Sequence, residues 1–235
     1  MAELAEKSEE LKKALVQMTV RTIIGLALMS LALFLSVGHL DVPRGWLTLG
    51  LYLGFAITEI LIFYKWNPDL IIARMQRRIG PYKWDKVFMV LLGVFLYGMF
   101  VVYGLDIRFQ WWSLNKYYII VGLVLFLVGG ILLTWSMVVN RYFENIVRIQ
   151  TDRAHKVISA GPYSVIRHPG YLGAGVQMIA FPFIIGSGIG LFIVIAIIIM
   201  MVVRTSLEDK TLQNELDGYA EYAKRVKYKL IPYIW

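Results

Sequence analysis

Five long apolar stretches dominate this sequence of 235 residues. A helix needs about 20 residues to cross a bilayer core about 30 Å thick. Four stretches approach or exceed that length, namely Thr22–Val37, Trp46–Tyr64, Val87–Leu105 and Tyr117–Val139. The fifth, Tyr171–Val203, is too long for one crossing and is interrupted by Gly186-Ser187-Gly188, which marks a tight turn. We therefore expect a helical hairpin there, with two arms that are each slightly short of a full crossing.

The composition agrees with a membrane protein. Hydrophobic residues make up 58% of the chain and charged residues 17%, whereas soluble domains have about 45–50% and about 25%. We predict an all-α fold, a polytopic transmembrane helix bundle of about six membrane helices with interfacial helices at both ends. Residues 19–139 would supply four transmembrane helices, and residues 140–235 a cofactor-binding and catalytic region.

Several kinds of site are not expected. The chain has no cysteine, and His39, His155 and His168 lie too far apart for a paired metal motif, so we expect no bound metal. Neither a Gly-x-Gly-x-x-Gly turn nor a phosphate-binding loop occurs in the sequence. Any cofactor must therefore be held by something other than a Rossmann sheet.

Residues 1–18 read as a short amphipathic helix. Leu4, Leu11, Leu15 and Met18 fall on one side, and Glu3/Lys7 is one of two pairs spaced i, i+4. We expect this helix to lie at the membrane interface.

The basic residues predict an orientation. With the N-terminus in the cytoplasm and both hairpin arms crossing, 21 of the 24 Lys and Arg residues fall on the cytoplasmic side. The outer loops hold only Arg44, Arg108 and Lys116. This obeys the positive-inside rule and places both termini in the cytoplasm. The net charge of +8 is thereby explained without a nucleic-acid partner.

One charge lies inside a predicted span. Glu59 falls within Trp46–Tyr64, and a carboxylate in lipid is costly unless it is buried or paired. It could line a transport pathway, satisfy an internal hydrogen bond or approach a cofactor cavity.

Two polar segments flank the hairpin. The first, from His155 to Gly173, contains Gly161-Pro162 and His168-Pro169, which predict a loop of fixed shape. Pro169 stands at a favoured first position of a helix, whose free N–H groups would attract an anion. The alternative is that the prolines only set a turn and that the basic residues lie at the interface.

The second segment follows the hairpin. Arg204 and Glu208 are four residues apart and share a helical face at the membrane edge, where a charge must be paired or solvated. They could be an ordinary interfacial ion pair. We interpret the Tyr, Lys and Arg residues of 219–229 as a solvated amphipathic helix lying on the membrane.

Together, these segments resemble the isoprenylcysteine carboxyl methyltransferase family and its relatives, which include membrane phospholipid N-methyltransferases. The family pattern His-x-Leu-Val-x-x-Gly-x-Tyr-x-x-x-Arg-His-Pro-x-Tyr-x-Gly is matched by His155, Gly161, Tyr163, Arg167, His168, Pro169, Tyr171 and Gly173. A second pattern, Arg-x-x-x-Glu-Glu-x-x-Leu and a terminal Tyr-x-x-Tyr-x-x-x-Val, is matched by Arg204, Glu208, Leu212, Tyr219, Tyr222 and Val226, with Asp209 replacing the second Glu. The resemblance covers about residues 141–235 and is greatest to prokaryotic members, which suggests a prokaryotic cytoplasmic membrane.

The resemblance implies S-adenosylmethionine-dependent methyl transfer at the cytoplasmic face. It implies catalytic roles for Arg204 and Glu208, and cofactor-binding roles for Gln150, His155, Gly161, Tyr163, Arg167, His168, Pro169, Tyr171, Leu172 and Asp209. The implied partners are membrane lipids and a lipid or prenylated substrate, the latter a small molecule or a protein. A carboxylate acceptor such as prenylcysteine needs alignment but no general base. Arg204 could pair with it bidentately and Glu208 could orient Arg204.

Three alternatives stay open from the sequence. A phospholipid amine would be an acceptor that needs a base to take its proton. A membrane reductase of the sterol-reductase type would use NADPH instead. A transporter or scaffold with the same fold would have no catalytic activity, and Glu59 would then line its pathway.

Overall fold

A computed structural model describes residues 2–76 and 82–235, with side chains from Ala5 onward. Its α-helices are α1 (Ala2–Val37), α2 (Pro43–Trp66), α3 (Pro68–Met75), α4 (Lys83–Phe109), α5 (Tyr118–Val139), α6 (Pro169–Ile185), α7 (Gly190–Glu215) and α8 (Tyr219–Arg225), with 3₁₀ turns η1 (Thr151–Arg153) and η2 (Gly161–Ser164). The described residues contain no β-strand beyond one isolated bridge between Ser113 and Ser187. The predicted all-α class is confirmed.

Five helices, α1, α2, α4, α5 and α7, are long and apolar enough to cross a membrane. Their outward side chains are apolar; Leu35, Val90 and Ile131 are each about two-thirds or more exposed, as expected of a surface that faces lipid. The sixth apolar helix, α6, has 17 residues. The chain is therefore a multi-pass helical membrane protein, as predicted.

The hairpin differs from the expectation of two short arms. Its first arm, α6, is short, but α7 continues without a break past Val203 to Glu215 and has 26 residues. No glycine or proline occurs in α7 after Gly190, and Gly218 follows its end, so nothing in the sequence stops the helix at the membrane edge. As a result α7 carries Arg204 and Glu208 on a rigid extension.

The amino-terminal helix is also longer than expected. The amphipathic segment 1–18 and the first span form one continuous helix, α1, of 36 residues. Apart from Gly25 this helix has no residue that favours a break. Two of the basic residues counted for the membrane orientation, Arg77 and Arg78, lie outside the described residues.

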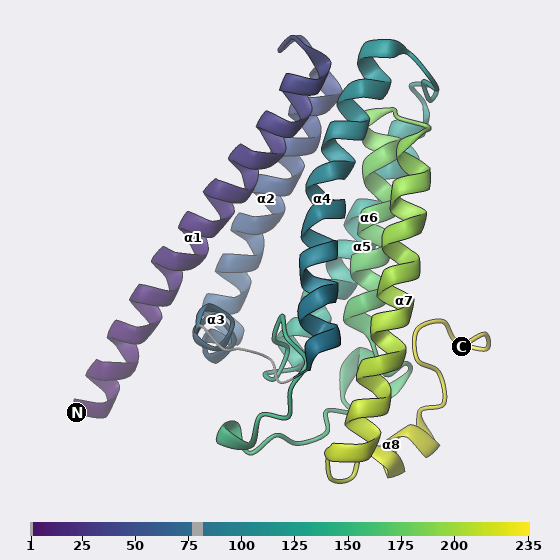
Figure 1. Cartoon of the computed structure of the whole chain (residues 1–235). Helices are drawn as coiled ribbons and strands as arrows, with labels where there is room; N and C mark the ends of the chain where they lie inside the picture. Colours follow the sequence, from purple (N-terminus) through teal and green to yellow (C-terminus); the bar gives the residue numbers. More distant parts are fainter. Residues whose placement is uncertain (1, 77–81) are drawn as a thin grey trace.

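The long helices lie side by side, and both termini are at the same end of the bundle (Figure 1). The short helices α3 and α8 and the irregular segment between α5 and α6 gather at that end, which we call the polar end. At the opposite end, buried Asp106 accepts hydrogen bonds from the Trp112 N–H at 2.8 Å and the Ser187 hydroxyl at 2.5 Å. These bonds fix the turn of the α6–α7 hairpin to the end of α4.

Helices α5 and α6 approach each other through glycines. A Cβ added at Gly129 would lie 2.6 Å from the Gln177 backbone nitrogen, and one added at Gly173 would lie 2.6 Å from that of Leu133. Such contacts are shorter than any real Cβ makes, so only glycine allows this backbone approach. The close packing holds the start of α6 against α5 and thereby positions the loop that precedes it.

A bulkier residue at this contact should separate the two helices. We expect Gly129→Val to lower the free energy of unfolding by about 1–3 kcal/mol, the usual cost of overpacking, as measured by thermal unfolding in detergent. The matched control is Gly93→Val, because no atom lies within 4 Å of a Cβ added at Gly93. Equal stabilities of the two variants would contradict this account of the packing.

Candidate functional site

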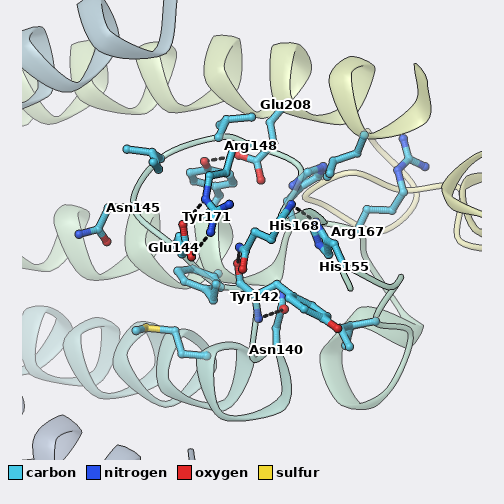
Figure 2. Close-up of a pocket in the computed structure, with 18 of the residues that line it drawn as sticks. Asn140, Tyr142, Glu144, Asn145, Arg148, His155, Arg167, His168, Tyr171 and Glu208 are labelled. Carbon is cyan, nitrogen blue, oxygen red and sulfur yellow. Dashed lines mark hydrogen bonds and ion pairs between the residues drawn. The ribbon is translucent and has the colours of Figure 1, made fainter. Parts of the chain in front are cut away.

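A cavity of about 290 Å³ lies at the polar end, between the segment after α5, the start of α6, α7 and α8. Figure 2 shows its side chains pointing inward from these segments. Eight of the twelve predicted site residues line it, namely Gln150, His155, Tyr163, Arg167, His168, Tyr171, Arg204 and Glu208. Residues almost 60 positions apart in sequence are thus brought into one place.

The other four predicted residues do not line the cavity. Gly161 has a φ of +56°, a left-handed conformation that favours glycine. Pro169 begins α6. These two residues shape the loop around the cavity. Asp209 is buried beside residues that line the cavity but does not line it itself. Leu172 does not line the cavity either.

Asp209 is the centre of a buried polar network. Its side chain is 1% exposed. The Arg167 guanidinium donates to both carboxylate oxygens, from Nε at 2.7 Å and from Nη2 at 3.0 Å. The Tyr219 hydroxyl donates to Oδ1 at 3.1 Å, and His168 Nε2 lies 3.1 Å from the same oxygen. One carboxylate therefore connects α7 to the loop before α6 and to α8; we call this arrangement the Asp209 network.

The same arginine, Arg167, also binds the carboxyl-terminal segment. Arg167 Nη1 donates to the carbonyls of Val226 at 2.7 Å and Lys227 at 2.9 Å. The backbone N–H of His168 donates to the carbonyl of Lys229 at 2.9 Å. Burial opposes protonation of Arg167, but the bonds to Asp209 outweigh it and raise the pKa of this guanidinium. Arg167 and Asp209 thus satisfy each other and hold the last segment beside the cavity.

The two predicted catalytic residues have different partners. Arg204 Nη2 lies 2.9 Å from Asp85 Oδ1 and donates to the Asn145 carbonyl at 2.6 Å. Glu208 instead accepts a hydrogen bond from the Tyr171 hydroxyl at 2.5 Å. No ion pair joins Arg204 to Glu208 in the part of the chain that the structure describes, so Asp85, not Glu208, orients the arginine.

Arg204 keeps one unused donor. Its Nε is buried and has no hydrogen-bond partner among the described residues, while the guanidinium is held 4.8 Å from the centre of the Phe88 ring. A buried donor without an acceptor is costly. The cavity beside it can therefore accommodate an anionic group that accepts this bond.

His155 lies at the edge of the cavity as a neutral imidazole. Its Nδ1 accepts a hydrogen bond from the Gln150 backbone N–H at 3.3 Å, and its ring centre lies 4.4 Å from that of Tyr142. Burial, followed by the nearby Arg148, lowers the pKa of His155 to about 4. At neutral pH this ring can donate from Nε2 but carries no charge.

Residues 120–214, which form most of this site, match the family model described as the isoprenylcysteine carboxyl methyltransferase (ICMT) family. The resemblance to the ICMT family is thus confirmed for this region. Among similar proteins, protein-S-isoprenylcysteine O-methyltransferase B of Arabidopsis thaliana is 28% identical over 85 residues, 36% of this chain and 41% of that protein. A probable protein-S-isoprenylcysteine O-methyltransferase of Oryza sativa subsp. indica is 36% identical over 64 residues, 26% of this chain and 34% of that protein. The match thus spans less than half the length of each of these relatives.

Just after the ICMT-like region, sequence reasoning misjudged two tyrosines. Tyr219 and Tyr222 were expected on a solvated helix, but they are 5% and 1% exposed and line the cavity. The Tyr222 hydroxyl donates to the Tyr163 carbonyl at 2.6 Å. The family pattern did contain a signal of their burial. The two tyrosines are three residues apart, and residues with this spacing lie on the same face of a helix.

Other charged residues of the site were missed altogether. Asp85 lies on α4, outside the ICMT-like region, and its ion pair with Arg204 joins positions 119 residues apart. The bidentate pair of Glu144 and Arg148, at 2.8 and 2.9 Å, borders the cavity itself. No motif in the sequence identified these residues, although each is a charge next to an apolar stretch.

A second, mostly apolar cavity of about 420 Å³ lies deeper in the bundle. It is bordered by α1 to α6, with Met29, Phe55, Phe100, Phe126 and Phe181 among its lining residues. Four residues line both cavities, namely Glu59, Arg74, Leu133 and Asn145. The two cavities are therefore adjacent, and we call the border formed by these residues the junction.

The Asp209 network should control the order of the carboxyl-terminal segment. In Asp209→Asn the buried charge of Arg167 loses its carboxylate, and we expect a loss of about 3–5 kcal/mol of stability. Hydrogen exchange of the backbone amides in α8 and in residues 226–230 should become faster than in the wild type. Asp217→Asn makes the same change at an exposed position and should have little effect. Unchanged exchange in Asp209→Asn would refute this role of the network.

Proposed function

We propose that this protein is an S-adenosylmethionine-dependent methyltransferase whose acceptor is a lipid-like carboxylic acid, most simply a prenylcysteine. The observation that carries the proposal is the junction between a polar cavity containing Arg204 and Glu208 and an apolar cavity inside the bundle. Such a pair of cavities suits a reaction between a water-soluble donor and a lipid acceptor. The names of the plant relatives support the same activity.

The polar cavity has the size and the donor set for the cofactor. Its volume of about 290 Å³ is near the lower end of ordinary ligand pockets, about 300 Å³. Carboxylates, tyrosines and a neutral histidine line it together with cations, which suits a molecule with an ammonium group, a carboxylate and an aromatic base. His155, Tyr163, His168, Tyr171 and Glu208 would hold it, and when bound it supplies an activated methyl group.

Arg204 would then orient the acceptor. Because the methyl group is already activated, a carboxylate acceptor requires no proton removal and the protein needs only to align the reactants. The ion pair with Asp85 and the hydrogen bond to the Asn145 carbonyl fix the guanidinium, so its free Nε can bind an acceptor oxygen without further ordering. Glu208, held by Tyr171, can accept a hydrogen bond from an ammonium group in the cavity.

The apolar cavity would hold the hydrocarbon tail. Burial of prenyl carbons there is favourable by about 25 cal/mol per Å², and the surrounding helices exclude water from the reacting carboxylate. The acceptor could reach the cavity from the membrane as a prenylated small molecule or as the end of a prenylated protein.

We further propose that the polar end faces the cytoplasm, so that both termini lie there. The distribution of Lys and Arg supports this orientation, and it would give the reaction access to soluble S-adenosylmethionine. The relatives named above are plant proteins and give no support to the expected prokaryotic origin.

The proposal predicts that binding of the cofactor and turnover of the acceptor can be separated. Arg204→Lys should keep saturable binding of S-adenosylmethionine in calorimetry, but it removes Nε and with it the proposed hydrogen bond to the acceptor carboxylate. We expect kcat/KM for a farnesylated cysteine acceptor to fall by about 10–100-fold, the cost of one charged hydrogen bond.

The control is Arg225→Lys, an exposed position on α8, which should retain full activity. Absence of S-adenosylmethionine binding in folded wild type would exclude the proposal, and NADPH would then be the next ligand to test. If the protein methylates a phospholipid amine but no carboxylic acid, the amine is the acceptor. A carboxylate that lines the cavity would then act as the base that removes the amine's proton.

A further inference from the structure

The segment after α8 exposes large apolar side chains outside the membrane spans. Tyr233 is 89% exposed, Ile234 77% and Ile231 45%. Neighbouring apolar side chains on a protein surface mark a contact with a membrane or with another molecule. We call residues 231–235 the tip. Its side chains need a surface that removes them from water.

The tip has a defined shape. Three consecutive backbone N–H groups donate to the Trp235 backbone oxygen at 2.9, 3.0 and 3.1 Å, those of Lys229, Leu230 and Ile231. The side chain of Leu230 is buried, and the Lys229 ammonium lies 4.7 Å from the centre of the Trp235 ring. These contacts close the segment into a turn, so its apolar side chains are presented together.

Two further backbone bonds hold the tip beside the start of α6. The N–H groups of Arg167 and His168 donate to carbonyls of the segment before the tip, those of Tyr228 and Lys229, each at 2.9 Å. His168 directly precedes α6. Figure 1 shows that the chain turns back after α8 and runs beside α7 toward the spans. The tip therefore lies at the border between the spans and the polar end.

The lipid-facing surface of α7 ends at the same level. Its exposed apolar side chains are spaced three or four residues apart and therefore share one face, namely Phe192, Ile195, Ile199, Val203 and Leu207. Asp209 follows Leu207 by two residues, about 3 Å along the helix axis. The Lys229 ammonium lies 3.8 Å from the Asp209 carboxylate. Because the bilayer interface begins where the apolar face ends, the tip is placed among lipid headgroups.

Basic side chains accompany the tip. Lys224, Arg225 and Lys227 are exposed, and Glu221 is the single acidic residue of 219–235. Anionic lipids attract basic residues near the membrane surface. An apolar group combined with a basic patch holds a bilayer more stably than either signal alone. The charge and the apolar side chains therefore fit the same partner, a bilayer surface that contains anionic lipid.

We propose that residues 224–235 are an interfacial anchor that binds the surface of a bilayer containing anionic phospholipids. The tip inserts among the headgroups, and Lys224, Arg225 and Lys227 contact the lipid phosphates. The apolar part of the anchor is the turn after α8, since the tyrosines of α8 line the polar cavity.

The anchor is connected to the wall of the polar cavity. Tyr222 and Arg167 line that cavity, and Arg167 donates to the carbonyls of Val226 and Lys227. A ligand that binds one form of a protein stabilises that form, so lipid bound to the anchor stabilises the ordered wall. Anionic lipid should therefore raise the affinity for S-adenosylmethionine. This consequence rests on the proposed function, whereas the anchor does not.

The absence of cysteine from the chain allows a single label to report on the tip. Ile234→Cys and a matched control in the exposed turn between α7 and α8, Asp217→Cys, would carry the same fluorophore in nanodiscs that contain a nitroxide-labelled lipid. We expect quenching at residue 234 to be at least about twofold stronger than at 217, and stronger with anionic phosphatidylglycerol than with phosphatidylcholine alone. Replacement of Lys224, Arg225 and Lys227 by glutamine should remove the response to anionic lipid.

In the same discs, anionic lipid should tighten S-adenosylmethionine binding by about fivefold, the effect expected of one basic residue near such a surface, and the glutamine variant should lose this gain. Equal quenching at the two positions, or quenching that anionic lipid does not change, would overturn the anchor. A disulfide between two copies of Ile234→Cys in place of quenching would also overturn it, because the tip would then contact a second chain.

The two readouts separate the anchor from the proposed function. If the tip responds to lipid but the S-adenosylmethionine affinity does not, the connection to the cavity is refuted. If S-adenosylmethionine does not bind in any disc while the tip is quenched as expected, the proposed function falls and the anchor stands.

Discussion

A single buried carboxylate, Asp209, organises the polar end of this membrane protein. It lies on the extension of α7, and the bonds from Arg167 and Tyr219 join that helix to the loop before α6 and to α8. Through Arg167 the same network also holds the carboxyl-terminal segment. Because a buried charge without its partner is strongly destabilising, we expect loss of this carboxylate to disorder these segments together, and with them the wall of the cavity.

The membrane imposes the rest of the arrangement. Long apolar helices leave little room for polar chemistry in the bundle, so charged side chains gather where helices end. The glycine contact between α5 and α6 brings the start of α6 close to the segment after α5. The extension of α7 then adds Arg204 and Glu208 from the other side. The polar cavity forms between these elements, and it meets the apolar cavity where α2 and α3 contribute Glu59 and Arg74.

Much of this could be predicted from the sequence, because its strongest signals are local. Apolar stretches of sufficient length predicted the spans, and the resemblance of the two polar segments to the ICMT family implied which residues belong to the site. Long-range pairs could not be predicted, since no local pattern shows that Asp85 is the partner of Arg204 or that Arg167 binds Asp209. Burial of Tyr219 was missed for the same reason: an amphipathic helix looks alike whether its face covers lipid or a cavity.

The most direct test of two joined cavities is to locate the acceptor's tail. A farnesylcysteine analogue with a photoreactive diazirine at the end of its chain would be cross-linked to detergent-purified protein and mapped by mass spectrometry. The account predicts labelling of residues that line the apolar cavity, such as Phe100, Phe126 and Met178, and competition by unlabelled acceptor. Labelling confined to lipid-facing residues such as Leu35, Val90 and Ile131, without competition, would contradict it.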